Sequence, residues 1–183
     1  MKGRAAVSTR FVAIDRACWR VLTPRWASEP LSGGGAAKRG GRWNEPGQPA
    51  LYFSEDHTTA FAEYMQDLER PGLFTPYHVE AERIVDLCDS AVRAAIGVDE
   101  TAMLCAWKAI ARIEKQRPPT WAIAAALLAG GADGVRVPSA QRASGVNIVL
   151  WRWNEPASPR VTVRDPSGDL PLDQRSWEPH ESR

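Results

Sequence analysis

The chain has 183 residues and a formal net charge of +1, with 44% hydrophobic and 25% charged residues. This length suits one domain, and the composition is that of an ordinary globular protein. The balance of 23 basic and 22 acidic residues disfavours direct nucleic-acid binding, which relies on a clustered basic surface. The longest apolar stretch, 121–131, is too short to span a membrane, and no signal core follows the basic start. We therefore expect a cytoplasmic protein.

Cysteine and histidine spacing gives no sign of a disulfide framework or a metal site. The three cysteines, Cys18, Cys88 and Cys105, include no CxxC pair, and the three histidines lack HExxH spacing. Structural zinc sites and disulfide scaffolds need such paired spacings. We expect buried or idle thiols and no bound metal.

The N-terminal half is predicted to hold two strands separated by a long glycine-rich loop. Residues 1–16 form an N-terminal segment, and the first strand is expected at 17–23. Residues 24–49 are rich in Gly, Pro and Ser without an apolar period, and loops of this length are often functional. The apolar run 50–54 predicts a short buried strand.

A helix is expected over residues 55–69, ended by Pro71 and Gly72. Ser54 would cap it, with two acidic residues in the first turn. Its buried stripe would be formed by Phe61, Met65 and Leu68, with Tyr64 beside it.

The C-terminal half mixes helices with further strands. Strands are expected at 75–87, 133–139, 146–153 and 160–165, and helices within 88–117, most clearly 100–117, and at 120–129. This order predicts one mixed α+β domain over 17–165, followed by a polar tail, 166–183. No internal repeat is present.

The glycine-rich loop is the first candidate site. Gly33–Gly35 and Gly40–Gly41 lead into Arg42. Glycine lets backbone N–H groups approach an anion, and arginine adds a fork of donors suited to phosphate. The stretch is neither a Walker loop nor a dinucleotide fingerprint. An anion-binding loop and a plain surface loop both fit it.

Two further candidates are a glutamate and a serine. Glu63 has Thr59, Gln66 and Asp67 as helix neighbours, which predicts a solvated polar face. A carboxylate beside a sugar would instead stabilise an oxocarbenium-like transition state. Ser139 follows a predicted strand and Pro138, where a site residue and ordinary turn chemistry are both common.

Three more side chains have both structural and functional interpretations. Arg20 lies inside an apolar strand, so it is either ion-paired or directed at a pocket. Trp43 and Tyr52 are either core aromatics or surfaces on which a planar ring stacks.

The order of four segments resembles the RES-domain family, the toxin half of a bacterial toxin–antitoxin pair. These segments are "CWRV" (18–21), "GGRWNEPG" (40–47), "LYFSEDHTTAFAEY" (51–64) and "VPSAQRASGVNIVLW" (137–151). The family is named for an arginine, a glutamate and a serine, matched here by Arg42, Glu63 and Ser139. Where members often continue through proline and histidine, this chain has "RWNEP".

The resemblance implies an ADP-ribosyltransferase-like fold that takes NAD+ as its substrate. Arg42, Gly41 and Arg20 would contact its phosphates or ribose, and Tyr52 and Trp43 its rings. Glu63 would stabilise the developing cation, and Ser139 would bind substrate or hold Glu63. The partner would be an antitoxin, often with a helix-turn-helix part, that blocks the NAD pocket.

The resemblance leaves the acceptor of ADP-ribose open. Some family members split NAD+ with water or phosphate, and at least one branch modifies a host protein, a nucleotide-biosynthesis enzyme. A degenerate, non-catalytic nucleotide-binding module is the alternative from another class. The presence of both Arg42 and Glu63 favours the enzyme.

Overall fold

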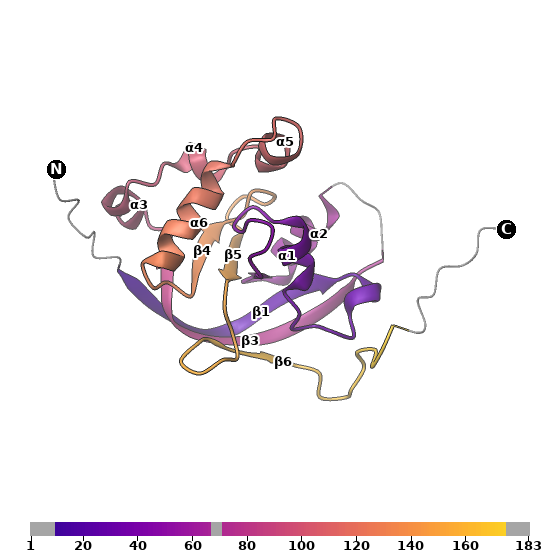
Figure 1. Ribbon diagram of the computed structural model, residues 1–183. Coiled ribbons are helices and arrows are strands. Elements are labelled where there is room, and N and C mark those ends of the chain that lie inside the picture. The colour runs from indigo at the N-terminus through magenta and orange to yellow at the C-terminus, as the bar shows by residue number, and fades with distance from the viewer. Residues whose placement is uncertain (1–9, 67–70, 175–183) are drawn as a thin grey trace.

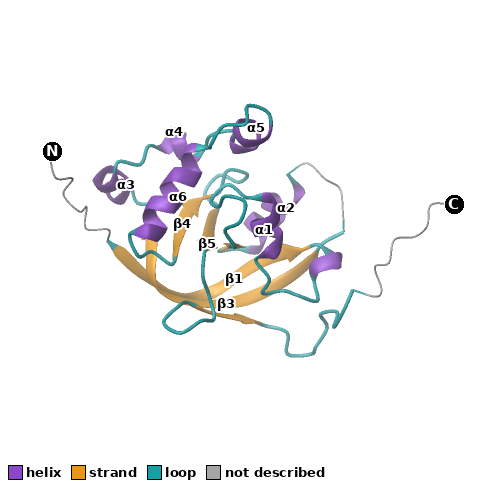
Figure 2. Ribbon diagram, viewed as in Figure 1, coloured by secondary structure: helices purple, strands orange, loops and turns teal. Residues whose placement is uncertain are grey.

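A strongly curved sheet with helices packed on one side makes up the computed structural model, which describes residues 10–66 and 71–174 (Figures 1 and 2). The N-terminal half contains β1 (Phe11–Leu22), a 3₁₀ turn at Pro24–Trp26, α1 (Gly34–Arg39), β2 (Leu51–Ser54), α2 (His57–Met65) and β3 (Leu73–Asp86). The C-terminal half contains α3 (Ser90–Ile96), α4 (Glu100–Met103), α5 (Trp107–Arg112), α6 (Pro119–Ala129), β4 (Gly134–Pro138), β5 (Val146–Leu150) and β6 (Arg160–Val163).

The sheet closes on itself. Its strand order is β1-β2-β5-β4-β3-β6, and β3 pairs back with β1, so five strands form a ring and β6 extends it along β3. The β3–β4 pair is parallel and the other pairs are antiparallel. The prediction of a single mixed α+β domain is therefore confirmed.

The alternation of side chains along β2 and β5 separates a core face from a cleft face. Leu51, Phe53, Ile148 and Leu150 join the cluster enclosed by the sheet, together with Ile14, Cys18, Tyr77, Val79, Ala81, Ile84 and Val161. A second buried cluster includes Val135 of β4 and Leu127 of α6. The intervening residues of β2 and β5 face the functional cleft described below.

Several predicted boundaries differ from the structure. The first strand begins at Phe11 rather than at 17, because β1 follows β3 in antiparallel register from Leu22↔Leu73 to Phe11↔Val85. The long loop contains a 3₁₀ turn and the short helix α1. The expected helix 100–117 is broken into α4 and α5. The predicted end of the first long helix, 67–69, and the chain ends 1–9 and 175–183 lie outside the described residues.

Helix α2 turns a different face inward from the one predicted. Thr59 and Ala60 are its buried residues, whereas Phe61 is 49% exposed and stacks on Phe74 with ring centroids 6.0 Å apart. Small side chains let α2 lie close to β1 and β2, and this close approach overrides the stripe predicted from hydrophobicity. Leu68, which completed that stripe, lies outside the described residues.

Asp56, not Ser54, caps α2. Its carboxylate accepts from the Thr59 backbone N–H at 2.8 Å and from the Thr59 hydroxyl at 2.6 Å, and it also meets Arg142. Partial desolvation alone would raise the pKa of Asp56, but bonds from Thr58 and Thr59 and the charge of Arg142 outweigh it and lower that pKa. The cap is therefore an ionised carboxylate near neutral pH.

We expect Asp56→Ala to lower the free energy of unfolding by about 1 kcal/mol at pH 7, the usual value of such a cap. Because the folded-state pKa is lowered, this contribution exists above the unfolded value of about 4 and fades as the pH falls. Urea unfolding at pH 7 and at pH 3 measures it. An equal difference between variant and wild type at both pH values would contradict the assignment.

Candidate active site

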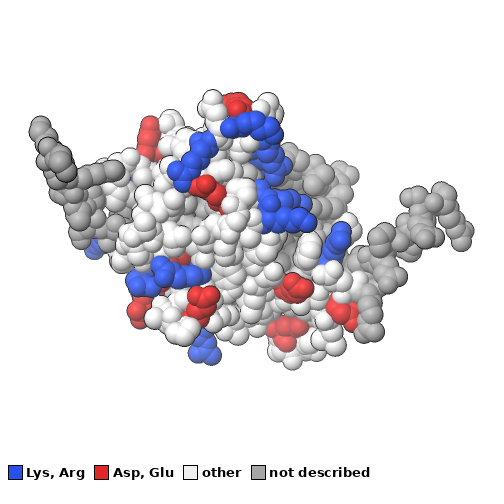
Figure 3. Space-filling view, in the orientation of Figure 1, with Lys and Arg blue, Asp and Glu red and all other residues white. Residues whose placement is uncertain are grey.

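A cleft of about 660 Å³ opens between α1, α2, α5 and the ends of β4 and β5. Four basic side chains line it, Arg39, Arg42, Lys108 and Arg112, together with one carboxylate, Glu63. Figure 3 shows Lys and Arg side chains gathered over α5 and between α5 and α1. The local charge is therefore strongly positive although the whole chain is nearly neutral, and such a cleft favours an anionic ligand.

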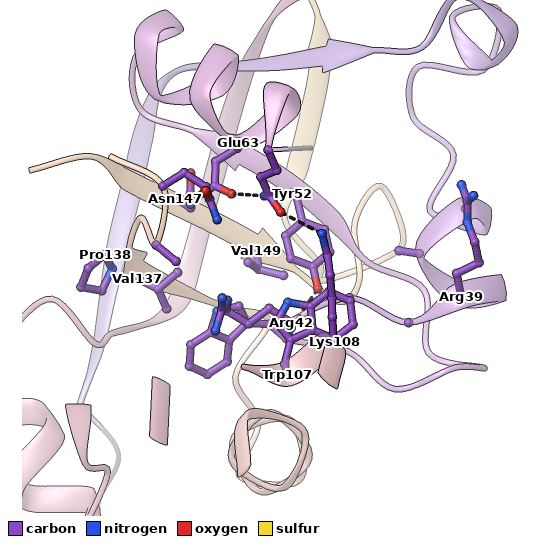
Figure 4. Close-up of a pocket in the computed structure, with 18 of the residues that line it drawn as sticks. Arg39, Arg42, Tyr52, Glu63, Trp107, Lys108, Val137, Pro138, Asn147 and Val149 are labelled. Atoms are coloured by element: carbon purple, nitrogen blue, oxygen red, sulfur yellow. Dashed lines mark hydrogen bonds between the residues drawn. The ribbon is translucent and has the colours of Figure 1, made fainter. Parts of the chain in front are cut away.

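Hydrogen bonds hold Glu63 on both of its carboxylate oxygens. Oε1 accepts from the Ser139 hydroxyl and from Asn147 Nδ2, both at 2.7 Å. Oε2 accepts from Gln66 Nε2 at 2.9 Å, and Gln66 in turn accepts from Lys108 Nζ at 3.1 Å. Figure 4 shows this last pair of bonds running from Glu63 toward Lys108. Glu63 is thus a fixed carboxylate, not a solvated surface residue.

Ser139 belongs to a turn and also contacts Glu63. Its hydroxyl donates to Glu63 and accepts from the backbone N–H groups of Gln141 and Arg142 at 3.1 and 3.2 Å. Ser139 therefore forms turn contacts and also supports Glu63, because the turn fixes the hydroxyl oxygen that bonds to the carboxylate.

Arg42 crosses to the opposite wall of the cleft. Its Nη1 donates to the backbone carbonyls of Met103 and Cys105 at 3.0 and 2.7 Å. Burial lowers the pKa of Arg42, and the nearby Cys105, Glu63 and Tyr52 oppose that effect. The two carbonyls lie where the chain leaves α4 and enters α5, so Arg42 stabilises the break between these helices. One end of the guanidinium is held, and the side chain still lines the cleft.

The glycines of the loop serve packing as well as the cleft. Gly33 precedes α1, and a Cβ there would lie 2.5 Å from the ring of Trp153. At Gly41 a Cβ would lie 2.3 Å from the Tyr52 hydroxyl and 2.7 Å from Asn44 Oδ1. The absence of a side chain at Gly41 therefore lets this loop lie on Tyr52, while Gly40 and Gly41 line the cleft.

Tyr52 and Asn44 lock the loop that carries Arg42. The Tyr52 hydroxyl donates to Asn44 Oδ1 at 2.6 Å and accepts from the Trp43 N–H at 3.0 Å. Asn44 is 1% exposed and donates to the carbonyls of Ala36, Glu45 and Gln48. Burial raises the pKa of Tyr52, which keeps the phenol protonated.

We expect Gly41→Ala to push Tyr52 out of this network and to destabilise the fold by about 1–3 kcal/mol, the usual cost of overpacking. Gly35→Ala is the matched control, because a Cβ at Gly35 meets nothing within 4 Å. Thermal unfolding of the two variants tests this expectation. Equal stability of the two would contradict the close packing of Gly41 on Tyr52.

Arg20 lies on the other side of Tyr52, in a smaller hollow of about 200 Å³ that shares Tyr52, Glu63 and Asn147 with the main cleft. Its Nη1 donates to the Pro30 carbonyl at 2.9 Å, and its guanidinium lies 5.5 Å from the Phe53 ring and 5.7 Å from the Tyr77 ring. Burial lowers the pKa of Arg20. Within the described chain it has no carboxylate partner, so of the two interpretations the structure supports a pocket-facing arginine.

Of the two interpretations of Trp43, a core aromatic residue or a stacking surface, its burial supports the core residue. It is 2% exposed and packs in the cluster beneath α6, and its carbonyl accepts from Trp151 Nε1 at 2.8 Å. Trp43 also borders the cleft, but its 2% exposure leaves little ring surface for a ligand. Trp107, half-buried on α5, lines the cleft with more of its surface exposed.

The sequence interpretation missed several cleft residues, including Trp107, and one support. Arg39, Lys108, Arg112 and Asn147 line the cleft, and Asn44 holds its loop. Two of these carried a signal, because an asparagine is unusual within the apolar strand "VNIVL" and Asn44 is the last letter of "GGRWN". The basic residues of α1 and α5 had none, because only the fold brings them together. Figure 4 shows Arg42, Trp107 and Lys108 grouped opposite Glu63, with Arg39 apart on α1.

Residues 10–66 and 71–174 offer neither a cluster of metal ligands nor a membrane-spanning helix. No group of three or more His, Cys, Asp or Glu side chains is placed to hold a metal ion. No helix in this part is both long and apolar enough to cross a membrane.

The fold and cleft define a small α+β domain with one fixed carboxylate facing a group of cations. The chain belongs to the RES domain family, whose model matches residues 17–173. Its fold is similar to that of a chain in the crystal structure of the M. tuberculosis MbcT–MbcA toxin–antitoxin complex, with a TM-score of 0.62 and 19% identity over 87% of this chain and 90% of that chain. No curated protein sequence matches it.

Proposed function

We propose that this chain is the toxin of a toxin–antitoxin pair and an enzyme that consumes NAD+ by breaking its nicotinamide–ribose bond. Membership of the RES family and the fold shared with a chain of a toxin–antitoxin complex support the first part. The observation that carries the second part is the fixed Glu63 carboxylate in a cleft with four basic side chains.

The chemical groups of NAD+ match this cleft. Its pyrophosphate carries two negative charges, which suit the basic side chains of α1, α5 and Arg42. Arg20, half-buried and without a carboxylate partner among the described residues, is a second candidate contact for phosphate or ribose. Tyr52 and Trp107 offer aromatic surface for the rings, and Gly41 lets the loop backbone approach the ligand.

In the proposed reaction the bond between ribose C1′ and the nicotinamide nitrogen breaks, and nicotinamide leaves with the bonding electron pair. Positive charge develops on the ribose, and the Glu63 carboxylate stabilises it. Water or phosphate then forms a bond to C1′, and an attacking water releases its proton to the solvent. Ser139 holds Glu63 and does not itself react.

Water or phosphate is the proposed acceptor because the basic wall of the cleft suits a small anion as well as NAD+. Transfer of ADP-ribose to a host protein is the alternative. Protein modifiers often pair two acidic residues near the acceptor site, and Asp67, the acidic neighbour of Glu63 in the sequence, lies outside the described residues. The proposed partner is an antitoxin, with a helix-turn-helix part, that closes the cleft and thereby blocks NAD+.

Growth and cellular NAD+ after induced expression test this function. We expect the wild-type chain to stop growth and lower NAD+, and Glu63→Ala to relieve both effects. Equal tolerance of wild type and Glu63→Ala would contradict the proposal and favour a non-catalytic binding module. Immunoblots must show equal amounts of both proteins.

A further inference from the structure

Two side chains behind Glu63 form a hydrogen-bonded chain that ends on its carboxylate. Ser54 of β2 and Asn147 of β5 are direct partners in the antiparallel register. Ser54 Oγ lies 2.7 Å from Asn147 Oδ1, and Asn147 Nδ2 lies 2.7 Å from Glu63 Oε1. Pairing of two strands 93 residues apart therefore sets the position of a group that contacts Glu63.

Chemistry fixes the direction of this chain. An ionised carboxylate only accepts hydrogen bonds, so the Asn147 amide must turn its nitrogen toward Glu63. Its oxygen then faces Ser54, whose single hydroxyl proton is committed to it. Ser54 is 3% exposed, so little water competes for that bond. Reversing the amide would place its oxygen against the carboxylate.

The sheet itself has no need of an amide at this position. Asparagine is disfavoured in strands, and the backbone of β5 pairs with β2 and β4 whatever the side chain is. Asn147 stands on the cleft face with Tyr52 and Val149, while Ile148 and Leu150 point into the enclosed core. Among the described residues, the Asn147 side chain forms hydrogen bonds with Ser54 and Glu63 alone.

The same contacts distinguish the two oxygens of Glu63. Oε1 receives two donors, Ser139 and Asn147, which occupy both of its lone pairs. Oε2 receives Gln66, which leaves one lone pair free to face a substrate. Loss of the Asn147 donor would let the carboxylate rotate about its last torsion, which is broad in energy.

We propose that Asn147, oriented by Ser54, is a positioning residue that fixes the Glu63 carboxylate with Oε2 toward the substrate. Its kinetic consequence rests on the proposed function. The hydrogen-bonded chain itself does not, so it can be measured without turnover.

Asn147→Asp is the sharpest variant because it keeps the shape and replaces the donor by a second carboxylate. Two carboxyl groups in contact do not both ionise easily, so such a pair holds a shared proton more tightly than a single carboxylate does. Among the described residues, the charged groups that share a hollow with Glu63 from other elements are Arg39, Arg42, Lys108 and Arg112 in the cleft and Arg20 in the smaller hollow. All of them are unchanged in this variant.

The kinetic experiment compares nicotinamide release from NAD+ between pH 5 and pH 9. We expect Asn147→Ala to lower kcat about 10- to 100-fold with little change in KM, as loss of alignment at a reacting centre does. Asn147→Asp should also move the acid limb of the profile up by about one pH unit or more. Ser54→Ala should lower kcat about fivefold, the equivalent of one hydrogen bond.

An NMR titration of carboxyl-labelled glutamate gives a second readout that needs no turnover, with the Glu63 signal assigned by Glu63→Gln. We expect its midpoint to rise in Asn147→Asp and to stay at the wild-type value in the control Asn154→Asp. Asn154 holds the backbone of Val161 outside the cleft. If Asn147→Asp fails to fold, loss of kcat at constant KM in Ser54→Ala is the deciding readout.

The outcomes separate the inference from the proposed function. An unchanged Glu63 titration in Asn147→Asp, or a fall in affinity for NAD+ with unchanged kcat in Ser54→Ala, would overturn the positioning role. A displaced titration with no nicotinamide release by the wild type would support the hydrogen-bonded chain and overturn the NAD+-consuming function instead.

Discussion

Glu63→Gln is expected to lower the rate of nicotinamide release on the order of a hundredfold. The variant keeps the size of the side chain and removes the negative charge that would face the ribosyl cation. Loss of a single electrostatic stabiliser in a preorganised site typically has an effect of this size. In the wild type Ser139, Asn147 and Gln66 all donate hydrogen bonds to the Glu63 carboxylate. The NH2 group of the new glutamine side chain cannot accept such bonds, so at least one of these donors would lose its partner.

Glu82→Gln is the matched control for this variant. Glu82 is an exposed glutamate on β3, outside the cleft, so we expect wild-type turnover. Initial rates at saturating NAD+ and thermal unfolding of both variants complete the comparison. A Glu63→Gln enzyme within a factor of two of the wild-type rate would remove Glu63 from the reacting centre.

Arg42→Ala is expected to weaken NAD+ binding about 10- to 100-fold. A hydrogen bond to a charged group contributes roughly 1.5–3 kcal/mol, which is about this range in Kd. The change also releases the carbonyls of Met103 and Cys105, so the wall formed by α5 would lose its anchor. Arg42→Lys should restore only part of the affinity, because an ammonium group lacks the planar fork of donors.

Isothermal titration with NAD+ measures this effect directly. Arg160→Ala provides the control, since Arg160 is exposed on β6 and lies outside the cleft. Unchanged affinity in Arg42→Ala would show that this arginine supports the wall of the cleft without touching the ligand.

Local sequence patterns predicted most strands because apolar runs such as 50–54 and 146–153 are bounded by turn residues, although the second strand ends already at Leu150. They failed for α2, where Thr59 is buried under Gly145 and Arg142 of a loop more than 80 residues away. The hydrophobic periodicity of a helix cannot reveal that a distant loop packs over one of its polar residues. For the same reason Glu63, expected on a polar face, was interpreted as functional only through the family resemblance.

Contacts between distant segments also explain what was missed in the site. Asn147 reaches Glu63 only because β5 pairs with β2 in the register that sets it opposite Ser54. The glycines before Arg42 suggested an anion cradle, whereas Gly41 proves to be packed on Tyr52, a contact that depends on a side chain 11 positions further on. Trp43 is buried, as large aromatic residues on average are.

The most direct test of the central claim follows nicotinamide release from NAD+ by the purified chain, in buffer alone, with added phosphate and with cell lysate, while labelled ADP-ribose is traced. We expect release without lysate and no labelled protein, as cleavage by water or phosphate requires. A labelled protein band with little release otherwise would show protein ADP-ribosylation instead. No release under any of the three conditions would contradict the enzymatic account and leave a nucleotide-binding module.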